Sequence, residues 1–160
     1  MNEAQMNLLE KELHARLPYG IKGIASVKKL VDTSDDWFFT EKKVDVEAEL
    51  IAIKYNDSIL LEYDTDGYSD DFDHYSLKDF KPYLRPMSSM TKEELKELRD
   101  IFNGDIDFNE WGLDILNSDF KRFSYLELLA VFDWLNAHHF DYRGLIEKGL
   151  ALVAPDGIYN

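Results

Sequence analysis

The stretch Lys81-Pro-Tyr-Leu-Arg-Pro-Met-Ser-Ser-Met-Thr91 separates a part of the chain with strand patterns from a part with helix patterns. Its two prolines fix φ, remove two backbone donors and favour extended backbone at Lys81 and Arg85. The stretch is short and partly apolar, whereas linkers between independent domains are usually longer and more polar. We therefore predict a crossing inside one domain, residues 1–160, with 21–86 mainly β and 87–160 mainly α.

Two capping boxes predict helices after this crossing. Thr91-Lys-Glu-Glu94 and Ser124-Tyr-Leu-Glu127 each place a hydroxyl three residues before a glutamate, so that each pair can satisfy amides at a helix N-terminus. The helix after Ser124 is apolar nearly all round and extends to about His139, which predicts a central buried helix. The predicted structural anchors of the crossing and the helices are Tyr83, Leu84, Pro86, Thr91, Leu95, Leu98, Phe102, Ser124, Leu128, Val131, Trp134 and Leu135.

The C-terminal residues predict one more short helix. Asp141 is a suitable cap for a helix at Tyr142–Lys148, and Gly149 follows as a residue that commonly ends helices. The apolar run Leu150–Val153 then predicts a strand or a docked tail.

The residues before the crossing predict a helix and several strands. Apolar residues at three- and four-residue spacing up to Leu17 predict an N-terminal helix that Pro18 and Gly20 end. A β-branched run at Ile21–Val31 predicts a strand. After it we expect a polar turn at Asp32–Asp36, a short strand at Trp37–Phe39 and a charged loop at Thr40–Lys43.

The clearest alternation of apolar and charged residues lies at Val44–Leu50, which predicts a strand with one solvated face. The apolar phase then slips at Ile51, so either a bulge falls near Leu50 or the second half is covered on both faces. Asn56-Asp57 predicts a tight hairpin into a strand at Ser58–Tyr63. Four to five short strands predict an α+β fold with an N-terminal helix, a small antiparallel SH3-like barrel or bent sheet, and a C-terminal helical layer.

Composition limits the expected partners. The chain has 32 acidic and 18 basic residues and a net charge of −14. Residues 1–86 hold 18 acids and 11 bases, and residues 87–160 hold 14 and 7, so each half carries −7. This charge opposes direct nucleic-acid binding and binding to anionic membranes, and it favours basic partners. The N-terminus lacks the pattern of a signal peptide, so we expect a cytoplasmic protein.

The acidic loop after Tyr63 is one candidate metal site. Its residues have the spacing of a calcium-binding helix–loop–helix loop, with ligand candidates at Glu62, Asp64, Asp66, Asp70 and Asp73 and with Gly67 for the sharp turn. The first position is Glu, the last is Asp rather than Glu, and the flank is a predicted strand. Solvated acids on a hairpin loop are the competing interpretation.

His138 and His139 are the other metal candidates. Neighbouring residues on a helix point about 100° apart and form no shared site by themselves. The interpretation that we favour places one histidine against the core or the helix C-terminus, where a partial positive charge is favourable. Cysteine chemistry is excluded because the chain has no cysteine. The sequence also has no nucleophile motif and no glycine-rich phosphate loop, so nothing in it favours an enzyme or a cofactor.

Long strings of this sequence resemble a family of uncharacterised proteins encoded by gut Bacteroidales and their phages. They are the crossing at Lys81–Thr91, the run from Phe132-Asp-Trp-Leu-Asn-Ala-His-His to Ala151, and the opening Leu8-Leu-Glu-Lys-Glu-Leu-His-Ala-Arg-Leu-Pro-Tyr-Gly20. The resemblance implies a cytoplasmic protein associated with a phage or a mobile element, and it implies no activity, ligand or catalytic residue.

Three functional hypotheses follow from the sequence. The first is a non-enzymatic accessory protein that binds another protein, as the many aromatic residues and the lack of catalytic motifs indicate. The second is a nucleic-acid mimic that inhibits a basic host protein with carboxylates in place of phosphates. The third is a calcium- or other metal-binding module at residues 62–73.

Overall fold

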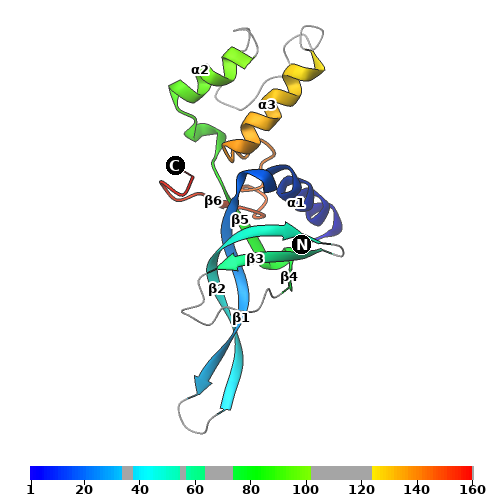
Figure 1. Ribbon diagram of the computed structural model, residues 1–160, viewed down its shortest axis with the longest axis vertical. Helices are drawn as coiled ribbons and strands as arrows, with labels where there is room; N and C mark the ends of the chain where they lie inside the picture. Colours follow the sequence, from blue (N-terminus) through cyan, green and yellow to red (C-terminus); the bar gives the residue numbers. More distant parts are fainter. Residues whose placement is uncertain (34–37, 55–56, 64–73, 102–123, 160) are drawn as a thin grey trace. The chain divides into compact units, whose positions relative to one another are not determined.

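The computed structural model describes residues 1–33, 38–54, 57–63, 74–101 and 124–159, with the backbone alone at 30–33, 38–40 and 74 (Figure 1). The chain forms two compact units, Met1–Tyr83 and Leu84–Asn160. The predicted α+β class and the N-terminal helix are confirmed. Two compact units are compatible with one domain or two, so the single domain stays a prediction.

Helix α1, Glu3–Arg16, begins the first unit. Its N-terminus has a capping box that the sequence analysis missed, because Asn2 and Gln5 each accept a hydrogen bond from the other's backbone amide. A 3₁₀ turn, η1 at Leu17–Tyr19, follows with Pro18 near its start, and Gly20 turns the chain with φ of +71°. Pro18 and Gly20 therefore end the helix as predicted.

Among the described residues, six strands form one sheet in the order β4-β3-β2-β1-β5-β6. Their bounds are β1 Ile21–Thr33, β2 Phe38–Ile53, β3 Ser58–Tyr63, β4 His74–Ser76, β5 Phe80–Leu84 and β6 Leu152–Val153. Leu84 belongs to the second unit, where its carbonyl accepts a hydrogen bond from the amide of Ala154 at 2.8 Å. The sheet is open, with β4 and β6 as the ends of the strand order, so the predicted SH3-like barrel is not confirmed.

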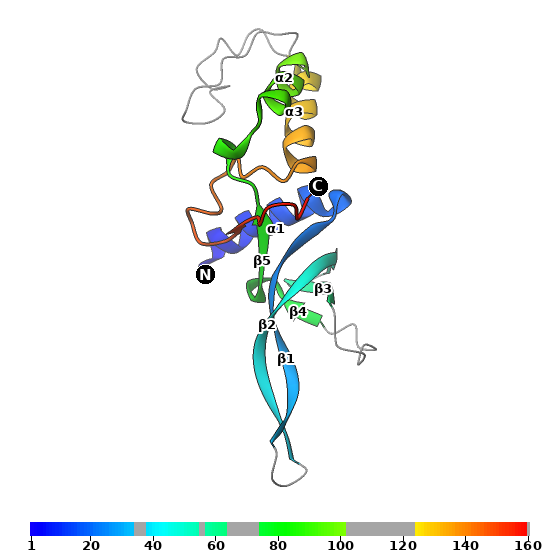
Figure 2. The ribbon, with the colours of Figure 1, turned by 90° about the vertical axis from the view of Figure 1, so that its left-hand side faces the viewer.

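The hairpin β1–β2 corrects the prediction at residues 32–33 and 40–43, while residues 34–37 of the predicted turn and short strand lie outside the described residues. The two strands pair without a break from Ile21↔Leu50 to Thr33↔Phe38, so that Asp32 lies in β1, and Thr40–Lys43, predicted as a loop, lies in β2. β1 pairs with β5 only at Gly23–Ala25, and β2 pairs with β3 only at 48–53, so the outer hairpin is a two-stranded ribbon (Figure 2). Glu41 and Lys42 are neighbouring residues of β2, so their side chains lie on opposite faces of the strand, and both are exposed. Charged residues can therefore occupy these strand positions without a burial cost.

Two details of the sheet confirm sequence predictions. The β2–β3 register shifts between Leu50 and Ala52, and Ile51 at the shift is 41% exposed, so a bulge falls near Leu50. Asp57 has φ of +56°, and the amide of Lys54 donates to the carbonyl of Ser58, which closes the predicted hairpin. The buried apolar residues of this unit are Leu9, Leu13, Ile21, Ala25, Val27, Ala48, Leu50, Ile59, Leu61, Tyr75, Leu77, Phe80 and Tyr83.

The described part of the second unit contains a 3₁₀ turn, η3 at Met87–Ser89, and two helices, α2 at Lys92–Ile101 and α3 at Tyr125–Ala137. Both predicted capping boxes are present, with reciprocal hydrogen bonds between Thr91 and Glu94 and between Ser124 and Glu127. One buried core cluster of this unit comprises Leu98, Val131, Leu135 and Phe140, and Leu84, Leu145, Leu150 and Ala151 are also buried. Among the described residues, no helix combines the length and apolar character needed to cross a membrane.

The predicted helix at Tyr142–Lys148 is wrong, because these residues form turns. The Asp141 carboxylate accepts hydrogen bonds from the amides of Leu145 and Ile146, at 2.7 and 2.8 Å. In a helix those amides would bond backbone carbonyls four residues earlier. Gly144 also has φ of +68°, which a continuous right-handed helix does not allow.

Candidate functional site

The backbone at Arg85 is held by residues that follow α3. The amide of Arg85 donates to the carbonyl of His139 at 2.8 Å, and the amide of Asp141 donates to the carbonyl of Arg85 at 2.7 Å. These bonds form an isolated parallel bridge between Arg85 and Phe140. Pro86 favours the extended backbone that this bridge needs at Arg85. Arg85, the residue before the second proline of the predicted crossing, is therefore held by backbone hydrogen bonds to a segment more than 50 residues further along the chain.

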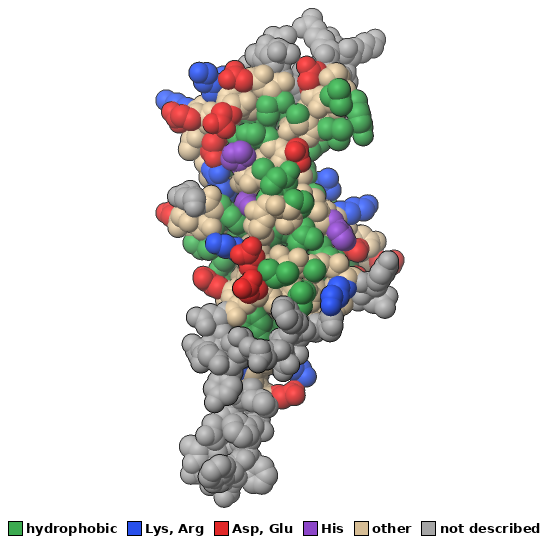
Figure 3. Space-filling view, viewed as in Figure 1, with side chains coloured by type: hydrophobic (Ala, Val, Ile, Leu, Met, Phe, Trp, Pro, Cys, Tyr) green, Lys and Arg blue, Asp and Glu red, His purple; other side chains and the backbone are tan. Residues whose placement is uncertain are grey.

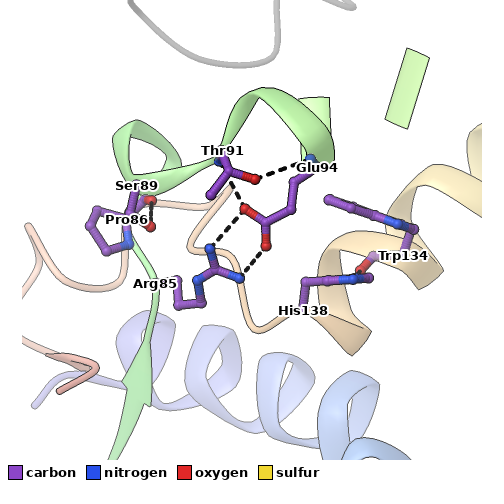
Figure 4. A network of polar contacts seen from close by, with 7 residues as sticks. All are labelled: Arg85, Pro86, Ser89, Thr91, Glu94, Trp134 and His138. Carbon is purple, nitrogen blue, oxygen red and sulfur yellow. Dashed lines mark hydrogen bonds and ion pairs between the residues drawn. The ribbon is translucent and has the colours of Figure 1, made fainter. Parts of the chain in front are cut away.

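The side chain of Arg85 forms a two-pronged ion pair with Glu94, one of two glutamates in the first turn of α2 (Figure 4). The two guanidinium nitrogens donate to the two carboxylate oxygens at 2.6 and 2.9 Å. The guanidinium carbon also lies 4.2 Å from the centre of the Phe140 ring, a cation–π contact. Glu94 accepts from the amide of Thr91 as well, so one carboxylate joins the crossing to the start of the helix.

These hydrogen bonds change the acidity of Glu94. The Arg85 guanidinium, followed by the Thr91 amide and hydroxyl, lowers the pKa of Glu94 to about 2, against the opposing effect of burial. A carboxylate of this acidity is a weak base. The network is thus suited to holding structure and not to moving protons.

The two adjacent histidines at the end of α3 have different environments. Nδ1 of His138 lies 2.9 Å from the carbonyl of Trp134, and its ring stacks on the Trp134 indole at 3.9 Å (Figure 4). His139 is buried, has φ of +56° and stacks on the Tyr159 ring at 3.6 Å. The two histidines therefore have different aromatic partners, and the expectation that they form no shared site stays a prediction.

No set of three His, Asp or Glu side chains able to hold a metal occurs within the described ranges. Of the calcium candidates, Glu62 is exposed on β3, while Asp64, Asp66, Asp70 and Asp73 lie outside the described residues. The calcium module therefore stays a prediction.

The predicted anchors fall into three groups in the structure. Tyr83, Leu84, Leu98, Val131 and Leu135 are buried, and Pro86, Leu95, Leu128 and Trp134 are half-buried. Thr91 and Ser124 are exposed caps, and Phe102 lies outside the described residues.

One side of α3 is an exposed apolar surface, which contradicts the prediction of a helix buried all round. The exposed fractions are 75% for Tyr125, 75% for Leu126, 46% for Leu129 and 39% for Phe132. At 3.6 residues per turn these four side chains cover roughly 120° of the helix, away from Val131 and Leu135. Figure 3 shows hydrophobic side chains gathered over α3. We call these four residues the α3 stripe.

Sequence reasoning missed both the α3 stripe and the Arg85–Glu94 pair. The apolar pattern of α3 signalled that its outer side was apolar, but not that this side would be exposed. The capping box predicted that Glu94 lies at the start of a helix. Its partner, Arg85, lies before that helix, on the other side of η3. No protein-family model, curated protein or solved structure matches the chain.

Proposed function

We propose that the chain is a non-enzymatic accessory protein of a phage or mobile element and that it works by binding another protein. The observation that carries this proposal is the α3 stripe, where four large apolar side chains share one exposed side of one helix. Single exposed apolar residues are ordinary, but contiguous ones typically mark interaction surfaces.

The composition of the stripe supports a protein partner. Tyrosine is enriched among the residues that dominate interface energies, and Phe132 and the leucines add apolar area that gains free energy when it leaves water. The Phe132 ring also packs on the ring of Tyr142 at 5.4 Å, which limits its motion before binding. A partly ordered aromatic side chain loses less conformational entropy when a partner covers it.

The alternative, nucleic-acid mimicry, has weaker support among the described residues. Asp45, Glu47 and Glu49 lie on one face of β2, as alternate residues of a strand do. Lys43 precedes them on that face, and Lys22 lies opposite Glu49 in the register. Cations at both ends interrupt the row of negative charge that a mimic of a phosphate backbone needs.

Affinity capture with a matched pair of variants tests the proposed function. The bait is the full chain, as wild type, as Leu126→Ala/Leu129→Ala, and as Ile51→Ala, which removes an exposed apolar side chain from β2. The prey is a lysate of a gut Bacteroidales bacterium, as the sequence resemblance suggests. We expect a protein that the wild type and Ile51→Ala capture and that the double variant loses. Equal capture by all three baits would contradict a role for the stripe.

A further inference from the structure

We infer that α2 is a displaceable cover on α3, which detaches while α3 stays folded and which the Arg85–Glu94 ion pair holds in place. The attachments of α2, the position of its ion-pair partner and the separate attachments of α3 lead to this conclusion. All of them belong to the second unit, Leu84–Asn160.

Helix α2 is shallowly attached. It has ten residues, all of which the structure describes, and Leu98 alone among them is buried. Ile101 packs half-buried against the same core cluster. Isolated helices of this length are only marginally stable in water, so α2 depends on its contacts with the rest of the unit. Segments with few buried apolar contacts open locally at a lower free energy than global unfolding requires.

The ion pair fixes the first turn of α2 to a separate part of the unit. Arg85 precedes the helix, and its backbone bonds the carbonyl of His139 and the amide of Asp141. Its side chain and that of Glu94 are only 24% and 17% exposed, so water screens this pair less than it screens a surface pair. When α2 detaches, Arg85 keeps its backbone bonds and loses Glu94, so the ion pair opposes detachment.

Helix α3 has attachments of its own. The Tyr142 hydroxyl donates to the buried side chain of Asn136 at 3.1 Å, and the segment after α3 bonds the backbone of the crossing. Val131 and Leu135 of α3 are buried in one cluster with Leu98. Detachment of α2 removes Leu98 from this cluster and uncovers a second apolar side of α3, away from the α3 stripe.

Hydrogen exchange of the full chain near neutral pH tests the cover. Mass spectrometry follows the amides of α2 and α3 in the wild type and in three variants. Glu94→Gln removes the charge that Arg85 contacts, while glutamine still suits the third position of a capping box. Glu93→Gln makes the same charge change at an exposed neighbour in the same turn. Ser124→Ala removes the cap of α3 and leaves α2 unchanged.

We expect wild-type α2 to exchange at least about tenfold faster than the slowest amides of α3. Low urea concentrations should speed α2 exchange less than α3 exchange, because detachment exposes less surface than global unfolding. Glu94→Gln should speed α2 exchange about tenfold, as for lost hydrogen bonds to a charged group, and Glu93→Gln by about twofold at most. Ser124→Ala should speed α3 exchange and leave α2 exchange unchanged, because α3 keeps its cap when only α2 opens.

Thiol labelling tests whether detachment uncovers α3. The chain has no cysteine, so Val131→Cys supplies a single thiol inside the core cluster. We expect an aromatic disulfide reagent to label this thiol with the weak urea dependence of α2 exchange. Adding Glu94→Gln should speed labelling by the same factor as α2 exchange, and adding Glu93→Gln should not.

The contrary results are distinct. If α2 exchanges no faster than α3, or if Ser124→Ala speeds exchange in both helices equally, α2 opens only with the whole unit and the cover is overturned. If labelling of the thiol follows the urea dependence of the slowest α3 amides, α2 does not cover that side of α3. If Glu94→Gln changes α2 exchange no more than Glu93→Gln does, the ion pair does not hold the helix in place.

Discussion

Gly23 lies so close to the backbone of Lys81 that no larger residue fits between β1 and β5. A Cβ built on Gly23 would be 2.3 Å from the carbonyl oxygen of Lys81 and 2.8 Å from Cζ of the Phe80 ring. Contacts below about 3 Å between nonbonded atoms force the backbone or the ring to move. Phe80 is a buried core residue, so its ring has little room to retreat.

Gly23→Ala is therefore expected to destabilise the protein. We expect a loss of roughly 1–3 kcal/mol, the usual cost of overpacking, measured by urea unfolding. The comparison is Gly149→Ala, where a Cβ would meet nothing within 4 Å and only the positive φ of +68° opposes the change. That variant should lose about 1–2 kcal/mol. A Gly23→Ala protein as stable as the wild type would show that β1 and β5 do not pack this closely.

The Arg85–Glu94 pair predicts a pH-dependent contribution to stability. The pKa of Glu94 is lowered from 4.5 to about 2 in the folded chain, so the unfolded chain binds this proton more tightly. The stabilisation is therefore fully present above about pH 4.5 and is lost as the pH falls toward 2. A shift of this size corresponds to at most about 3 kcal/mol.

Glu94→Gln tests this dependence. We expect the variant to be less stable than the wild type at pH 7 and the difference to shrink steadily between pH 4.5 and pH 2. Glu93→Gln, an exposed neighbour in the same helix turn, is the control and should change stability by less than about 0.5 kcal/mol at either pH. A constant difference between wild type and Glu94→Gln across this range would contradict the lowered pKa.

His139→Gly separates backbone strain from ring packing. Glycine adopts the φ of +56° without strain, which alone would stabilise the variant by about 1 kcal/mol. The imidazole is 2% exposed and stacked on Tyr159, and we expect its loss to outweigh this gain. The matched control is Asp57→Gly, at an exposed residue with the same φ, which should be neutral or stabilising.

A double-mutant cycle with Tyr159→Ala then measures the stack itself. We expect a coupling energy of about 0.5–1.5 kcal/mol between His139 and Tyr159. If His139→Gly stabilises the chain as Asp57→Gly does, only the backbone conformation of His139 at the end of α3 affects stability, and its stacking on Tyr159 contributes nothing to folding.

The ion pair between Glu12 and Arg16 on α1 is almost completely buried, with 1% exposure for each residue. Removing one partner leaves a buried charge, so Glu12→Gln should cost roughly 3–5 kcal/mol in urea unfolding. Replacing both, as Glu12→Leu/Arg16→Met, should cost much less, because two apolar side chains of similar volume need no partner charge. A double variant as damaged as Glu12→Gln would show that the surroundings, and not the pairing, require these charges.

The sequence predicted the features that depend on residues close together in the chain. The boxes at Thr91 and Ser124 need only a hydroxyl and a glutamate three residues apart, and both helices begin there. The bulge near Leu50 and the turn at Asp57 follow from the slip in alternation and from a residue type that tolerates positive φ. The α+β class followed from these local patterns.

The features that sequence reasoning missed depend on distant residues or on solvent. The prediction interrupted the strands at residues 32–33 and 40–43. The charged run Glu41–Lys43 resembles a loop unless both faces of the strand are known to be exposed to solvent. The short helix after Asp141 was predicted from its cap, while the positive φ at Gly144 cannot be inferred from residue type. The same limit applies to α3, because an apolar pattern does not tell which apolar side remains in solvent.

The outer ribbon of β1 and β2 makes the first unit adjustable in length. The strands pair without a bulge from Ile21↔Leu50 to Thr33↔Phe38, and beyond the neighbouring strands β1 and β2 pair only with each other. Deleting two successive opposed pairs, such as Lys28 and Lys29 with Lys42 and Lys43, shortens the ribbon while the inner register and the faces of the outer side chains are kept. The outer ribbon can therefore be shortened or lengthened by removing or adding opposed residues in both strands, while the inner part of the sheet keeps its pairing.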